Sequence, residues 1–297
     1  MINKPNYYYT IAQTSQITGL TKETIRKWEE RYQLIQPKRL KNGYRQYTQQ
    51  DILCLFQIQK FVRQGSSIRE AMEKTTPTLD YHPQIVHYLF QLLEYGYNCD
   101  EVAFHCILTE AQLMLNIEEF LNELITPFLY KVGDNWENKI WYEYQETLAS
   151  AIIRDFLAVI RRNLPVNSEQ PLIIGACLPG EQHEIAMEML LIQASIKGYR
   201  NLMIGSSPSV STIEQLVDKL KPTIVLLSAA TLLPFEHYPD ELANLEKFAE
   251  KQATVRFIIG GEGARRYIEA HPFKHIQFCN ELSKIFTRFC LKTISTP

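Results

Sequence analysis

Residues 8–52, YYTIAQTSQITGLTKETIRKWEERYQLIQPKRLKNGYRQYTQQDI, contain two short helical patterns on either side of the turn signal Thr18-Gly19. The first pattern covers 11–17. The second begins at Lys22, directly behind Thr21, a residue type that commonly caps a helix N-terminus. The stretch therefore predicts a helix-turn-helix.

The part that follows the turn is locally basic and ends in a hairpin signal. Residues 20–46 hold eight Lys and Arg against three Glu, in a chain whose formal net charge is −2. Asn42-Gly43 favours the tight turn of a hairpin spanning 39–47, which would form a wing beside the helices. A basic segment in a mildly acidic chain is expected of a nucleic-acid contact surface. A basic helical hairpin that is merely solvated explains the charge pattern equally well.

If the segment binds DNA, its second helix enters the major groove and its hairpin holds flanking phosphates. The candidate DNA contacts are then Thr21, Lys22, Thr24, Arg26 and Lys27 on or beside the helix, and Arg39, Lys41, Tyr44 and Arg45 in the hairpin.

The composition is that of a globular protein. The length of 297 residues suits two or three domains, and 45% hydrophobic with 22% charged residues is ordinary for folded material. No apolar run approaches the roughly 20 residues that span a bilayer, and the N-terminus lacks the apolar core of a signal peptide. We therefore expect a cytoplasmic protein with no membrane partner. Its six cysteines form no CxxC pair and are expected to be buried, reduced thiols.

The hydrophobic pattern changes twice along the chain and predicts the domains 1–76, 77–169 and 170–297. Four amphipathic stretches predict a helical bundle in the middle domain: 83–95, 99–113, 116–133 and 140–163. They are separated by turn signals at Gly96, Asn116 and Asp134-Asn135. Apolar runs alternate with helices in the last domain, which predicts a doubly wound parallel sheet: 172–177, 202–204, 224–227, 257–259 and 276–278. A final helix is expected from Glu281. The fold class is thus multidomain α and α/β: a winged helix-turn-helix, a four-helix bundle and a Rossmann-like sheet.

The loop after the first predicted strand of the sheet, residues 178–183, carries the polar groups of a possible site. Ligands of open α/β sheets bind beyond the carboxyl ends of the strands. Gly180 permits a close backbone approach, and His183 could bind a metal through one ring nitrogen while Glu181 orients the other. A histidine alone in such a loop is more often a surface or helix-capping residue.

The N-terminal stretch strongly resembles the DNA-binding domain of MerR-type regulators. The matching residues include Gly19, Arg26-Lys27-Trp28-Glu29, Gly43-Tyr44-Arg45, Tyr47 and Asp51. The resemblance implies a pair of winged helices on a two-fold operator in double-stranded DNA. The long dimerisation helix and C-terminal cysteines of the metal-sensing branch have no recognisable counterpart, so metal sensing is not expected.

The C-terminal domain resembles cobalamin-binding domains. Glu181-x-His183-x-x-Ala186 is similar to their D-x-H-x-x-G loop. After 41 further residues, Ser228-Ala229-Ala230 stands at the S-x-L position, and after another 29, Gly260-Gly261 stands at the paired glycines. The resemblance implies that His183 is the lower cobalt ligand in place of the cofactor's own base. The displaced nucleotide tail would lie beside Ser228 and the two glycines.

The middle domain resembles the helical cap of the B12-dependent photoreceptor repressors (CarH/LitR type). Trp136, nine further residues and Glu146-Thr147 are similar to their W-x9-E-H signature. The resemblance implies that the bundle covers the upper face of adenosylcobalamin, with Trp136 packing on the adenosyl group and Glu146 accepting its hydrogen bonds. A core aromatic and a solvated carboxylate are the simpler interpretations of these two residues.

The expected function is therefore a transcriptional repressor, forming dimers or tetramers, controlled by cobalamin bound between the bundle and the C-terminal domain. Thr147, Ala186 and Ala230 depart from the signatures, so light responsiveness stays open, with His105 as a candidate substitute for the missing histidine. A regulator whose cobalamin-like domain serves only oligomerisation or partner binding is the alternative. A corrinoid methyltransferase or mutase is disfavoured because no segment remains for a substrate-activating domain.

Overall fold

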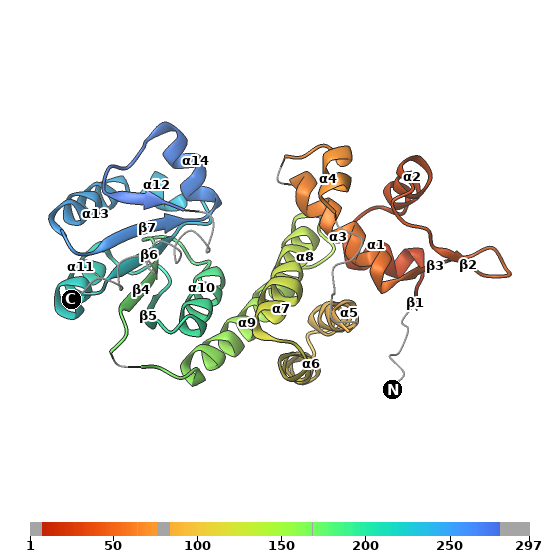
Figure 1. Ribbon diagram of the computed structural model, residues 1–297, viewed down its shortest axis with the longest axis horizontal. Helices are drawn as coiled ribbons and strands as arrows, with labels where there is room; N and C mark the ends of the chain where they lie inside the picture. Colours follow the sequence, from red (N-terminus) through yellow and green to blue (C-terminus); the bar gives the residue numbers. More distant parts are fainter. Residues whose placement is uncertain (1–7, 64, 76–83, 168, 280–297) are drawn as a thin grey trace, which may run out of the picture. The chain divides into compact units, whose positions relative to one another are not determined.

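The computed structural model describes residues 8–63, 65–75, 84–167 and 169–279, which form two compact units (Figure 1). Unit 1 is Met1–Ile152 and unit 2 is Ile153–Pro297. No helix in the described ranges is both long and apolar enough to cross a membrane.

The predicted helix-turn-helix and hairpin are confirmed in unit 1. The helices are α1 (Ile11–Thr18) and α2 (Lys22–Tyr32), and the side chain of Thr21 accepts the N–H of Thr24 to cap α2. Strands β2 (Lys38–Arg39) and β3 (Arg45–Thr48) form the hairpin.

A third strand, β1 (Tyr8–Tyr9), pairs with β3 and gives the sheet order β1-β3-β2. This strand was not predicted, because two residues are too few to show a periodicity. Helices α3 (Gln49–Arg63) and α4 (Ile68–Lys74) complete the module. Its core contains Ile25, Trp28, Ile35, Tyr47, Leu55, Ile58 and Ala71.

The four predicted stretches of the middle domain are helical over most of their described residues. They form α5 (Ile85–Tyr97), α6 (Glu101–Met114), a continuous run of α7 (Ile117–Glu119), the π-helix η1 (Phe120–Ile125) and α8 (Thr126–Glu137), and lastly α9 (Glu143–Asn163).

Two of the expected turn signals in this domain are wrong. Gly96 lies inside α5, where an added Cβ would come within 2.7 Å of the Trp141 ring, so the glycine serves close packing. Asp134-Asn135 lies inside α8, and the carbonyl of the buried Asn135 accepts the N–H groups of Ile140 and Trp141 beyond the helix end.

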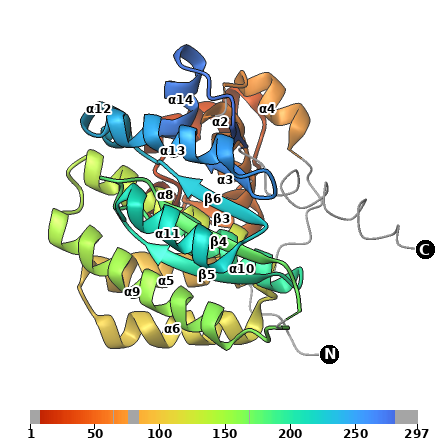
Figure 2. The same ribbon diagram turned by 90° about the vertical axis from the view of Figure 1, so that its left-hand side faces the viewer.

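Unit 2 contains a five-stranded parallel sheet in the order β5-β4-β6-β7-β8, which confirms the doubly wound prediction (Figures 1 and 2). The strands are β4 (Leu172–Cys177), β5 (Arg200–Gly205), β6 (Ile224–Ser228), β7 (Arg256–Gly260) and β8 (Ile276–Phe278). The helices are α10 (Ile185–Ile196), α11 (Val210–Leu220), α12 (Leu233–His237), α13 (Pro239–Lys251) and α14 (Glu262–Ala270). The expected helix from Glu281 lies outside the described residues.

The two faces of this sheet have separate cores. Helix α10 packs on one face through Met187 and Leu191, while α11 and α13 pack on the other through residues such as Ile213 and Leu245. The chain leaves β4 toward β5 on one side and returns to β6 on the other. The ends of β4 and β6 therefore form the switch point, where ligands of such sheets bind.

A buried ion pair fastens the end of α9 to α10 within unit 2. Arg161 donates from Nε to Oε2 of Glu188 at 2.6 Å and from Nη2 to Oε1 at 3.3 Å, and both side chains are nearly inaccessible. Removing one partner would leave the charge of the other unpaired in the interior.

We expect Arg161→Met to lower the free energy of unfolding by about 3–5 kcal/mol, because Glu188 loses its counter-charge. Urea denaturation followed by far-UV circular dichroism measures this change. Arg162→Met removes an exposed arginine from the same turn and is the matched control, with little expected effect. Equal urea midpoints for both variants would show that the ion pair does not stabilise the packing of α9 on α10.

Candidate functional site

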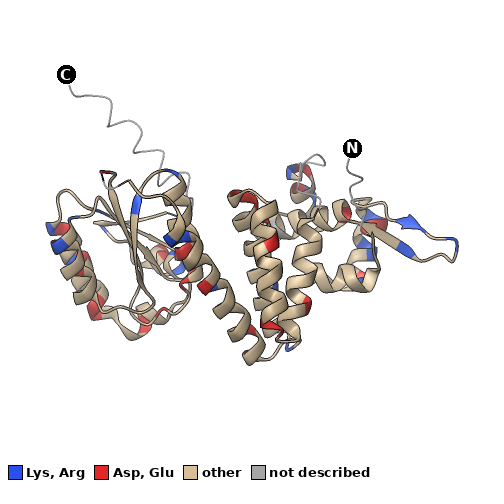
Figure 3. Cartoon of the chain, turned by 90° about the horizontal axis from the view of Figure 1, so that it is seen from below, with Lys and Arg blue, Asp and Glu red and all other residues tan. Residues whose placement is uncertain are grey.

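The exposed face of α2 carries cations. Ile25 and Trp28 face the core, whereas Lys22, Arg26 and Lys27 are exposed. Lys27 forms an ion pair with Glu23 at 2.9 Å on the same face, and both groups remain largely in solvent. This leaves Lys22, Arg26 and, in the last turn, Arg31 as the α2 cations for which no ion pair is found in the described part of the chain. Lys and Arg also mark the hairpin (Figure 3).

The two hydroxyls at the start of α2 bond to each other. Thr21 Oγ1 accepts the backbone N–H of Thr24 and lies 2.8 Å from the Thr24 hydroxyl. Their observed role is therefore to cap the helix, and direct contact of either with DNA stays a prediction.

Glu29 of α2 bonds to arginines of the hairpin formed by β2 and β3 and so links the hairpin to the helix. Its Oε2 accepts a hydrogen bond from Nε of Arg45 at 2.7 Å, and Arg39 lies 3.6 Å from its Oε1. The Arg45 side chain is only 18% exposed, so it orients the hairpin, while Lys41 and Tyr44 are exposed near the hairpin tip. Arg45 was predicted to contact phosphate; in the structure its side chain is paired with Glu29, and its contact with DNA stays a prediction.

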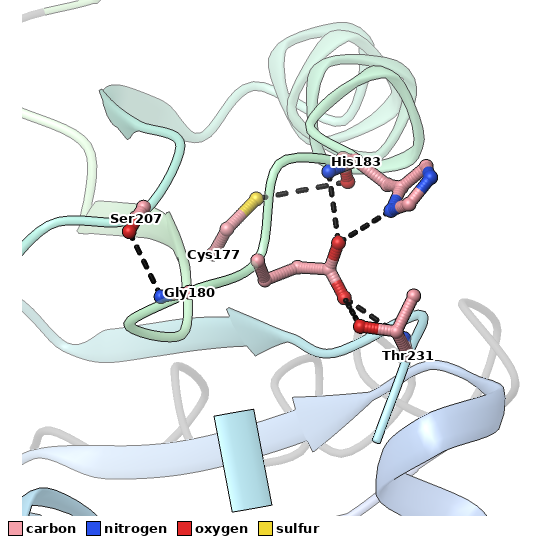
Figure 4. Close-up of polar contacts among 6 residues, drawn as sticks. Cys177, Gly180, His183, Ser207 and Thr231 are labelled. Atoms are coloured by element: carbon pink, nitrogen blue, oxygen red, sulfur yellow. Dashed lines mark hydrogen bonds and ion pairs between the residues drawn. The ribbon is translucent and has the colours of Figure 1, made fainter. Parts of the chain in front are cut away.

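In unit 2 the loop after β4 holds a buried carboxylate beneath an exposed histidine (Figure 4). Oε1 of Glu181 accepts the backbone N–H of His183 at 2.9 Å and lies 2.5 Å from Nδ1 of the ring. Oε2 accepts the backbone N–H of Thr231 at 2.8 Å and its hydroxyl at 3.0 Å. One buried side chain thus joins the loops after β4 and β6.

The charge of Glu181 sets the orientation of His183. Burial alone would raise the pKa of this carboxyl, but hydrogen bonds from His183 and Thr231 outweigh it and hold the pKa at about 2. Because the carboxylate is ionised, the network assigns the ring proton to Nδ1. The lone pair then lies on Nε2, at the side of the ring that faces away from Glu181 (Figure 4). A carboxylate supporting a histidine in this way is the usual arrangement behind a metal ligand.

Further contacts hold the loop in this shape. Gly180 has a φ of +83° and donates its N–H to Oγ of Ser207 at 2.8 Å. Burial raises the pKa of the Cys177 thiol to about 12, so the thiol stays protonated. Its Sγ donates to the His183 carbonyl oxygen at 3.7 Å. Neither Cys177 nor Ser207 was identified from the sequence.

The residues predicted for the nucleotide tail lie together at the same edge of the sheet. Ser228 is opposite Gly260 in the ladder between β6 and β7. An added Cβ on Gly261, which has a φ of +106°, would come within 2.3 Å of the Ala229 carbonyl oxygen. One on Gly263 would come within 1.9 Å of the Thr231 carbonyl oxygen. Gly261 and Gly263 therefore let the loop after β6 approach α14 closely. Gly263 was not predicted as a residue of this site.

In unit 1 the structure separates two tryptophans. Trp141 is 4% exposed and fills the bundle core, whereas Trp136 near the end of α8 is 51% exposed. Glu146 lies in the first turn of α9 and accepts a hydrogen bond from Ser150 at 2.8 Å. The exposure of Trp136 argues against its being an ordinary core aromatic.

Other candidate groups are less constrained. His105 is exposed on α6, and so is Cys106, which corrects the expectation that the cysteines are buried. Among the described residues, no group of three or more His, Cys, Asp or Glu side chains could hold a metal ion by itself.

Comparison with known proteins matches two stretches of the chain to families. Residues 9–76 match the MerR HTH family regulatory proteins, and residues 88–161 match the B12 binding domain. The HTH-type transcriptional regulator CueR of Vibrio cholerae is 39% identical over 66 residues, which cover 22% of this chain and 48% of CueR.

Longer matches extend along most of the chain. The HTH-type transcriptional repressor CarH of Myxococcus xanthus is 26% identical over 274 residues, covering 87% of this chain and 90% of CarH. CarA of the same organism is 27% identical over 266 residues, covering 88% of each chain. Both relatives are HTH-type transcriptional repressors.

A solved structure shares the fold of about two thirds of the chain. The monomethylamine corrinoid protein of Methanosarcina barkeri superposes with a TM-score of 0.54 over 67% of this chain and 94% of its own, at 16% identity. The chain is therefore a DNA-binding regulator of the MerR helix-turn-helix family that carries a B12-binding domain, and it is homologous to the repressors CarH and CarA over most of its length.

Proposed function

We propose that this protein represses transcription and that a cobalamin cofactor ligated by His183 controls its binding to operator DNA. The observation that carries the proposal is the buried, ionised Glu181, which orients the exposed His183 ring at the switch point of a corrinoid-type sheet. In this proposal residues 1–76 bind DNA, 77–169 form the cap and 170–297 hold the cofactor.

The residues present suit the cofactor. His183 would bind the metal, Ser228, Gly260 and Gly261 would border the nucleotide tail, and Trp136 with Glu146 would contact an adenosyl group. When bound, adenosylcobalamin supplies a cobalt ion whose bond to the adenosyl carbon is broken by visible light. Glu181 in place of aspartate supports the fit, because the side chain reaches both His183 and Thr231. Ala186 is exposed, so its methyl group does not crowd the loop.

The test begins with the protein purified in the dark with adenosylcobalamin. We expect a corrin absorption spectrum to co-elute with the chain, and His183→Ala to abolish it or change it, because cobalt loses its protein ligand. His105→Ala removes an exposed histidine of the cap and is the comparison for the light response. Corrin bound identically by wild type and His183→Ala would rule out the ligand assignment.

The same samples test control of DNA binding. A duplex enriched from a random-sequence pool by the wild-type protein serves as the operator in gel shifts, in the dark and after illumination. We expect dimers or tetramers with adenosylcobalamin in the dark, and at least tenfold weaker operator binding after light disperses them, because linked modules gain affinity by acting together.

A second candidate function is a MerR-type regulator that uses its C-terminal domain only for oligomerisation or partner binding. The observation in its favour is Thr147, which is exposed at the position where the photoreceptor signature has histidine. This candidate requires equal operator affinity and equal oligomeric state with and without cobalamin, in darkness and in light.

A further inference from the structure

The turn of the helix-turn-helix lies against a buried lysine of the bundle. Gly19 ends α1 with a φ of +77° and donates its N–H to the Ser15 carbonyl at 2.9 Å. The position that a Cβ on Gly19 would occupy is 2.6 Å from Nζ of Lys131, a residue of α8. Lys131 is only 5% exposed, although lysine is among the residues least often buried.

The chemistry at this contact is complementary. The last carbonyls of a helix are unpaired within it and carry partial negative charge, so a cation there is stabilising. Helix α1 has no basic residue in its own last turn. The ammonium of Lys131 lies at this end of α1 and brings a positive charge to it from another helix, with the carboxylate of Asp134 beside it, whose Oδ2 is 3.6 Å from the same Cβ position.

A second contact joins the same two parts of unit 1. Tyr9 in β1 is 5% exposed, and its ring meets that of Phe90 in α5 edge to face, with centroids 6.4 Å apart. One contact alone would act as a pivot. Two contacts on different helices of the bundle restrict the orientation of the winged helix within unit 1.

We propose that Lys131 is a positioning residue for operator recognition: by holding the turn at Gly19, it fixes the direction in which α2 leaves the turn. Only two residues, Leu20 and Thr21, separate Gly19 from the start of α2. Trp136 follows Lys131 by five residues on α8, about 7–8 Å along the helix. The helix that presents the proposed cap residue therefore also supports the turn before the recognition helix.

The proposal predicts that Lys131→Met weakens operator binding about tenfold, because a winged helix with more orientations loses more entropy when both copies dock. The salt dependence of binding should stay unchanged, because Lys131 does not contact phosphate. Lys41→Met in the hairpin should instead weaken binding and lower the salt slope by about one. Lys139→Met removes an exposed lysine of the same domain and should change neither quantity.

A double-mutant cycle tests the contact itself, even if single variants lose stability. Gly19→Ala has two costs: its positive φ strains an alanine, and its methyl group must push Nζ of Lys131 away from the turn, so that the contact is lost. Lys131→Ala removes the second cost, so the two losses of operator affinity should combine to less than their product. Losses that multiply, or wild-type affinity for Lys131→Met, or a lowered salt slope for that variant, would each overturn the proposal.

This inference rests on the operator binding of the proposed function and not on its cobalamin part. A wild-type protein that enriches no duplex would contradict the proposed function. A wild-type protein that binds its duplex while Lys131→Met binds equally well would contradict only the role of Lys131.

Discussion

Replacing Gly263 by alanine should remove cobalamin binding and destabilise unit 2 by about 3 kcal/mol or more. The new methyl group would lie 1.9 Å from the Thr231 carbonyl oxygen, a separation that no pair of non-bonded atoms tolerates. The loop after β6 must therefore move away from α14. That movement breaks the bonds from the N–H groups of Gly263 and Ala264 to the carbonyls of Ala230 and Ala229.

Displacement of the loop after β6 would also affect the orientation of His183. Thr231 supplies both hydrogen bonds to Oε2 of Glu181, so displacing it leaves a buried charge half satisfied. The orientation of the His183 ring then loses its support. Thermal unfolding and a corrin-binding titration measure the two effects.

Gly133→Ala is the matched control, because Gly133 is also helical but an added Cβ there has no neighbour within 4 Å. This change should be neutral or stabilising by about 0.5–1 kcal/mol, since alanine favours a helix over glycine. If both variants bind corrin with wild-type affinity, the close approach at Gly263 does not support the site.

The difference between Glu181 and Thr231 shows what the sequence could predict. Glu181 and His183 are two residues apart in one loop, so their spacing was enough to propose a carboxylate behind a ligand. Thr231 is 50 residues from Glu181 and reaches it only because β4 and β6 are neighbours in the sheet. Gly263 depends on the same topology, because its constraint comes from the carbonyl oxygen of Thr231.

The same contrast holds in unit 1. The capped helix α2 and the Asn42-Gly43 hairpin follow local rules, and both were predicted. The π-helix was not, because its extra residue per turn leaves no distinct composition. The burial of Lys131 was not predicted either, because a lysine on an amphipathic helix is normally assigned to the solvent face.

Glu181→Gln should weaken cobalamin binding by about 10–100-fold, the usual cost of losing the group behind a metal-bound histidine. An amide keeps the size of the side chain but has one acceptor oxygen where the carboxylate has two. It can accept the donors of His183 or those of Thr231, and its NH₂ group must face the other pair. Thr231→Val removes only the hydroxyl donor and should produce a smaller change in the same direction.

The pH dependence of stability separates the charge of Glu181 from its shape. Its folded pKa of about 2 is below the ordinary value of 4.5, so the ionised form stabilises the fold above pH 4.5. This contribution, about 3 kcal/mol, is lost as the pH falls from about 4.5 toward 2, where the folded state must also take up the proton. Glu181→Gln should lack it, so wild type and variant should converge in unfolding free energy as the pH is lowered through this range. A constant difference between them from pH 6 to pH 3 would mean that the carboxylate contributes by its shape alone, and the assignment of the ring proton to Nδ1 of His183 would lose its basis.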